Sequence, residues 1–171
     1  MPREGAADPV EGCLESCRRC DAVVASVLAQ DPAAYGAIGP HLRHCLDHFQ
    51  LFLDGWPSGG VDYDDRERDV RAEREPAVAR GLIREILTRL ASMRGVDLGR
   101  EIVVVSAAAP GRPPLSTRSR LERELVFLSS HTIHHIAIMI LCAREAGVTI
   151  PLDLGVAYST EAHRSSLLAQ D

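Results

Sequence analysis

The chain has 171 residues, 46% of them hydrophobic and 25% charged, which indicates a single globular domain with a substantial core. Its net charge of −5 excludes the basic surface that nucleic-acid-binding proteins normally carry. The acidic start, MPREGAADPVEG, lacks the apolar core of a signal peptide, and histidines interrupt the longest apolar stretch, around 125–142. We therefore expect no nucleic-acid partner, no membrane association and a cytoplasmic location.

Two helices are predicted in the first third of the chain. The segment EGCLESCRRCDAVVASVLAQ is rich in helix formers, so a helix is expected over about 10–30, ending before the proline- and glycine-rich DPAAYGAIGP. Pro40 suits the first turn of a second helix over about 40–55.

Two further helices are predicted after the loop that follows residue 55. Apolar spacing in EPAVARGLIREILTRLASM predicts a helix over about 75–94. The β-branched run EIVVVS, followed by AAAPGRPP, predicts one strand or an extended crossover. Ser116 or Thr117 is expected to cap a long helix over about 117–147, which Gly147 would end.

These elements predict an all-α fold, a four-helix bundle with one short extended segment before the last helix. The bundle is expected to occupy residues 1–155, and residues 156–171 are expected to form a C-terminal tail. The two long connections leave the order of the helices in the bundle open.

Six of the seven histidines fall into two short segments. In SHTIHHIAIMI, His131 and His135 are four residues apart, so they share the centre of an apolar helical face. Each buried imidazole must satisfy two ring nitrogens, and a shared metal ion satisfies one nitrogen of each ring. The alternative is a pair of structural histidines in the core.

The other segment, HLRHCLDHFQ, offers three candidate ligands on a facing helix, as a metal site inside a bundle requires. These are His41, His44 and His48. The apolar stripe of this helix is centred nearer His41 and His48, so periodicity alone favours His48.

The segments HLRHCLDHF and HTIHH, about ninety residues apart, resemble the DinB/YfiT-like superfamily of metal-binding four-helix bundles over residues 10–150. This resemblance implies a metal site of His44, His131 and His135, so it selects His44 where periodicity favours His48. Many relatives carry a glutamine shortly after the last histidine, whereas this chain has Ile136, Ala137 and Ile138 there.

Three histidines leave a coordination position open, which is typical of a catalytic or ligand-binding ion. Neutral imidazoles suit zinc, nickel or ferrous iron. The resemblance implies a metal-dependent S-transferase that activates a low-molecular-weight thiol toward a small-molecule substrate. The alternative is a metal-binding stress-response bundle without turnover, and a metal-free interaction bundle is a third hypothesis.

Other side chains are candidates for supporting roles. Asp47 or Glu124 would orient a ligand imidazole, and Glu124 is also a candidate base; the alternative for both is a surface or capping carboxylate. The run YDDRERD (63–69) is expected to be a solvated loop, and the alternative is a rim where Arg66 or Arg68 binds the carboxylates of a thiol cofactor.

The last helix is apolar nearly all round, which predicts a homodimer. The odd number of cysteines, five, predicts reduced thiols that are small core residues.

Overall fold

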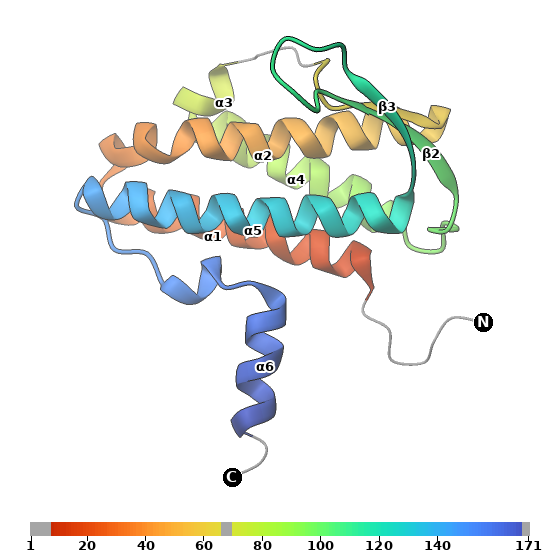
Figure 1. Ribbon diagram of the computed structural model, residues 1–171. Coiled ribbons are helices and arrows are strands. Elements are labelled where there is room, and N and C mark those ends of the chain that lie inside the picture. The colour runs from red at the N-terminus through yellow and green to blue at the C-terminus, as the bar shows by residue number, and fades with distance from the viewer. Residues whose placement is uncertain (1–7, 66–69, 169–171) are drawn as a thin grey trace.

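The fold, described by a computed structural model for residues 8–65 and 70–168, is built mainly from helices (Figure 1). Four of them are long, and all four lie where the sequence predicts a helix: α1 (Pro9–Gln30), α2 (Tyr35–Gly55), α4 (Pro76–Ser92) and α5 (Leu121–Glu145). Asp8 caps α1, because its side chain accepts a hydrogen bond of 2.9 Å from the backbone N–H of Val10.

Helix α2 begins earlier than the sequence indicates. It starts at Tyr35, directly after the short 3₁₀ helix η1 (Pro32–Ala34), so Pro40 lies inside the helix and the expectation of a first-turn proline is wrong. Proline lacks the N–H that would bond to the carbonyl of Gly36. Burial of neighbouring Ile38 and Leu42, both 0% exposed, stabilises the helix across this break.

The long helices pack around one hydrophobic core. Helix α5 contacts α1 and α2, and each of these also contacts α4. Phe49 and Phe52 of α2 are at most 1% exposed, as are Ile83 and Ile86 of α4. This arrangement places α2 and α5, the helices that carry the two histidine segments, against each other.

A three-stranded sheet covers one end of the helices, where the sequence predicts only one extended segment. Its strands are β1 (Gly60–Asp62), β2 (Glu101–Ser106) and β3 (Leu115–Arg120), in the order β1-β2-β3. Strand β1 pairs with β2 in parallel, and β2 pairs with β3 antiparallel. The sheet contacts α2 through β1 (Figure 1).

The start of the last long helix is a correction to the sequence prediction. Ser116 and Thr117 pair with Val105 and Val104 in the sheet instead of capping a helix. Helix α5 therefore begins at Leu121. The residues before it form β3, because the backbone N–H and C=O groups along that edge of β2 need hydrogen-bond partners.

The C-terminal segment has more structure than a tail. It contains the 3₁₀ helix η3 (Leu152–Gly155) and helix α6 (Tyr158–Leu168), which extends away from the other helices (Figure 1). Arg19 of α1 anchors it through an ion pair of 2.9 Å with Glu161 and hydrogen bonds to the carbonyls of Leu154 and Val156. The remaining short helices are η2 (Trp56–Ser58) and α3 (Arg71–Arg74).

Among the described helices, α5 alone is long and apolar enough to span a bilayer by length and composition, with 44% of its most apolar window buried in the fold. Core helices of soluble proteins pass the same test.

Candidate metal centre

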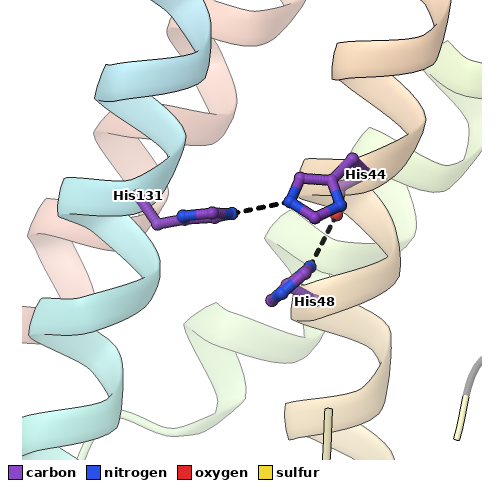
Figure 2. Close-up of side chains that lie close together, drawn as sticks. All are labelled: His44, His48 and His131. Carbon is purple, nitrogen blue, oxygen red and sulfur yellow. Dashed lines mark hydrogen bonds between the residues drawn. The ribbon is translucent and has the colours of Figure 1, made fainter. Parts of the chain in front are cut away.

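Imidazoles from α2 and α5 meet between the two helices. Figure 2 shows His44 and His48 on α2 facing His131 on α5. The Nε2 atoms of His44 and His131 are 2.9 Å apart. One ligand nitrogen from each of the three rings lies within 4.8 Å of the other two, and this set could hold a metal ion.

The orientation of the His48 ring is fixed by the backbone of its own helix. Its Nδ1 lies 2.8 Å from the carbonyl oxygen of His44, one turn earlier. A carbonyl oxygen only accepts hydrogen bonds, so Nδ1 carries the hydrogen and Nε2 carries the lone pair. This is the arrangement of a metal-binding histidine whose second nitrogen donates to a backbone carbonyl. His48 is only 7% exposed, so solvent barely reaches the ring.

A second pair of histidines extends the cluster along the same two helices. The Nδ1 atoms of His41 and His135 are 3.1 Å apart. The centroid of the His135 ring lies 4.6 Å from that of His44 and 4.6 Å from that of His131. The two helices therefore bring five imidazoles together.

The spacing of the nitrogens suits a cation. With metal–nitrogen bonds of about 2.0–2.1 Å, two nitrogens on a tetrahedral ion lie about 3.3 Å apart. The His44–His131 separation of 2.9 Å is close to that value. Two facing lone pairs would repel each other, so either a proton or a shared cation must lie between these nitrogens. A donor set of imidazoles suits zinc, nickel or ferrous iron.

The sequence-based ligand set and the closest set of nitrogens share two members. His44 and His131, predicted from the two motifs, belong to both. The third member of the closest set is His48, which apolar periodicity favours, whereas the family resemblance implies His135. His135 lies beside this set and contacts His41.

His135 is held in its neutral form. Burial, and then the neighbouring imidazoles of His41, His134 and His48, lower the pKa of His135 to about 4. A neutral imidazole at physiological pH is the form that binds a metal ion.

Aromatic rings pack the side of the cluster nearest the sheet. Tyr63, directly after β1, stacks on His48 with ring centroids 5.4 Å apart. Phe127 of α5 stacks on His131 at 5.4 Å and contacts Tyr63 at 5.6 Å. Sequence spacing does not reveal the contacts of Tyr63, because no spacing rule connects a three-residue strand with a helix about sixty residues away.

Glu124 reaches this aromatic side. Its carboxylate is 1% exposed and accepts hydrogen bonds from the hydroxyl of Tyr63 at 3.0 Å and that of Ser119 at 2.6 Å. The guanidinium of Arg123 donates a third, at 3.0 Å. Burial and the Glu124 carboxylate raise the pKa of the Tyr63 hydroxyl well above its usual value, so Tyr63 remains a donor. Tyr63 therefore links the Glu124 carboxylate to the His48 ring.

The remaining residues predicted to support the site are Asp47, Arg66 and Arg68. Asp47 forms an ion pair of 2.7 Å with Arg43, which also binds Glu73 at 2.9 Å. Arg66 and Arg68 lie outside the described residues. All five cysteines are free, and four of them are buried in the core, as the sequence predicts: Cys13, Cys17, Cys20 and Cys45.

Comparison with known proteins leaves the family open. No family model matches the chain, and no solved structure matches it. The chain is similar to FK506-binding protein 5 of Rhizopus delemar, with 29% identity over 104 residues. That match covers 60% of this chain and 27% of the fungal protein, so the chain spans about a quarter of that relative's length.

Proposed function

We propose that this protein is a metal-binding four-helix bundle of the DinB/YfiT-like type and that it acts as a metal-dependent thiol S-transferase. The observation that carries the proposal is the meeting of imidazoles from α2 and α5, with Nε2 of His44 and Nε2 of His131 2.9 Å apart. The two motifs behind the resemblance lie on these helices.

His44 and His131 would hold the ion, and the third nitrogen would come from His135 or His48. Three protein nitrogens leave a coordination position for a ligand. An ion bound there would lower the pKa of a low-molecular-weight thiol, so that the sulfur reacts as a thiolate.

The residues of the site would bind the thiol beside the ion. In the reaction, the thiol proton passes to solvent and the sulfur lone pair forms a carbon–sulfur bond with an electrophilic carbon. The bond from that carbon to its leaving group breaks, and the leaving group takes the electron pair; from an epoxide, this group stays in the product as an alkoxide that takes a proton from solvent. No oxidant or reductant is needed.

Metal content tests the site. Purified protein should contain about one equivalent of zinc, nickel or iron by elemental analysis, and His44→Ala and His131→Ala should each lose most of it. Undiminished metal in both variants would refute the site. Exposed His163→Ala, in α6, is the matched control, because it removes an imidazole from another part of the chain.

Thiol dependence tests the reaction. Metal-loaded protein is incubated with a chlorinated nitroaromatic or an epoxide and a panel of low-molecular-weight thiols, and thioether formation is measured. Turnover with at least one thiol, lost in His131→Ala, supports the transferase. Bound metal without turnover by any thiol favours the alternative, a non-enzymatic metal-binding protein of the stress response.

A further inference from the structure

A cavity of about 420 Å³ opens on α5 beside the histidine cluster. Its lining consists of Arg123, Val126, Phe127, Ser130, His131 and His134. His131 belongs both to this lining and to the set of nitrogens that could hold an ion. A molecule in the cavity can therefore approach the ion from the side of His131.

Arg123 lies at the other end of the cavity and is held there by two contacts. One nitrogen donates to the buried carboxylate of Glu124 at 3.0 Å, and the guanidinium carbon lies 5.5 Å from the centroid of Phe127. The side chain is nevertheless 66% exposed. A guanidinium has five N–H donors, so the bond to Glu124 engages only part of its capacity. These two contacts already restrict the Arg123 side chain at the rim of the cavity, so binding an anion there costs little further side-chain entropy.

Phe127 separates the cation from the metal site. Its centroid lies 5.5 Å from the guanidinium carbon of Arg123 and 5.4 Å from the centroid of His131. Val126, 57% exposed, adds further apolar surface to the cavity. A ligand that contacts both Arg123 and the ion beside His131 must therefore carry an anionic group at one end and a metal-binding atom at the other. The apolar segment between these two groups must be long enough to pass the ring of Phe127.

We propose that Arg123 is a specificity-determining residue that selects thiols with a carboxylate at the end of an apolar chain. The carboxylate would pair with the guanidinium, the chain would lie along Phe127, and the sulfur would reach the ion beside His131. This inference rests on the proposed function, because it requires the ion to bind a thiol.

Calorimetric titration of the zinc-loaded protein tests the proposal with three probes: mercaptohexanoate, neutral mercaptohexanol and the shorter mercaptopropionate. Mercaptohexanoate should bind roughly fivefold more tightly than either of the others, the gain expected from one partly exposed ion pair. Its advantage over mercaptohexanol should shrink as the salt concentration rises.

Variants assign the preference to Arg123. Arg123→Gln should reduce the affinity for mercaptohexanoate to that for mercaptohexanol and leave the affinity for mercaptohexanol unchanged. Arg144→Gln is the matched control, since it removes the same charge from an exposed position near the other end of α5. Arg123→Lys keeps the positive charge but lacks the planar guanidinium with its paired N–H donors. It should therefore retain part of the preference for mercaptohexanoate.

The outcomes separate the two proposals. If neither zinc, nickel nor ferrous iron binds, or if no thiol binds to the metal-loaded protein, the proposed function fails. If all three thiols bind to the wild-type protein with equal affinity, the role of Arg123 is overturned while the metal site stands. This wild-type comparison decides the question even if substitution of Arg123, which faces a buried carboxylate, prevents folding.

Discussion

The hydroxyl of Tyr63 donates a hydrogen bond of 3.0 Å to Oε2 of Glu124, which joins the end of β1 to the first turn of α5. The same tyrosine ring stacks on His48 at 5.4 Å. One side chain thus connects a buried carboxylate with the histidine cluster. The two contacts can be separated, because one depends on the hydroxyl and the other on the ring.

Tyr63→Phe should lower the free energy of unfolding by about 1–3 kcal/mol, since the buried Glu124 carboxylate loses a donor. Zinc affinity should change little, because the ring that packs on His48 remains. Tyr63→Ala should also weaken zinc binding. Denaturant unfolding and zinc titration measure the two effects. Tyr158→Phe is the control, as it removes a hydroxyl that donates to the carbonyl of Gly12. Equal zinc affinity in Tyr63→Phe and Tyr63→Ala would contradict a role for the ring.

Single substitutions of His48 and His135 should each weaken zinc binding, by at least the ~10–100-fold that loss of an outer-shell partner costs. The larger loss identifies the third ligand. Zinc competition with a chromogenic chelator measures the affinities. Exposed His134→Ala, next to His135, should bind zinc as the wild-type protein does. If His48→Ala and His135→Ala both match the wild type, neither residue contributes to the site.

Two glycines in α2 should respond to alanine in opposite directions. A Cβ at Gly39 would overlap the carbonyl oxygen of Glu73, whereas a Cβ at Gly36 meets nothing within 4 Å. Gly39→Ala should therefore destabilise the protein by roughly 1–3 kcal/mol through overpacking. Gly36→Ala should stabilise it by about 0.5–1 kcal/mol through higher helix propensity. Thermal unfolding of the two variants checks the contrast, and equal shifts in Tm would refute the close approach of α3 to α2.

Stability should fall at alkaline pH because of the buried thiols. Burial raises the pKa of Cys20 to about 12 and raises the pKa values of Cys13, Cys17 and Cys45 above the ordinary value of 9.0. The unfolded chain loses these protons near pH 9 while the folded protein keeps them, so stability is fully present below pH 9 and is lost as pH rises toward 12. Urea unfolding as a function of pH measures the effect. Cys20→Ala should reduce the slope of the unfolding free energy against pH. A slope equal to that of the wild-type protein would exclude Cys20 as a contributor.

Arg19→Ala should detach the C-terminal segment from α1. Arg19 binds Glu161 and lies over the ring of Tyr158 at 5.1 Å from its centroid. Limited proteolysis should therefore cut the variant faster within residues 152–168. Arg18→Ala removes an exposed neighbour that pairs with Glu11 on the same helix, and it should be cut at the wild-type rate. Equal rates for both variants would argue against Arg19 as the anchor.

The sequence predicts the long helices because their boundaries are local. Apolar periodicity and proline- or glycine-rich breaks depend on neighbouring residues only. The sheet depends on distant partners: β1 has three residues, and β3, LSTRSR, is mostly exposed and shows no apolar alternation. A polar edge strand carries no hydrophobic signal, so the sequence predicts a loop and a helix start where β3 lies.

The candidate site likewise combines features that depend on neighbouring residues with features that depend on distant contacts. Spacing of four residues places His131 and His135 on one helical face, and a second histidine segment predicts a facing helix. The choice between His48 and His135 depends on ring orientation, which is set by contacts such as the one from Nδ1 of His48 to the carbonyl of His44. The contact of Tyr63 with His48 arises from sheet pairing, so sequence spacing does not reveal it.

The two facing imidazoles also have a consequence for folding. His44 and His131 are 87 positions apart, so an ion held by both would act as a removable cross-link across half of the polypeptide. Such a link reduces the freedom of the denatured chain and resists any opening that parts α2 from α5. Chelation would then shorten the lifetime of the folded protein, and the supply of metal in the cell would govern how long each molecule persists.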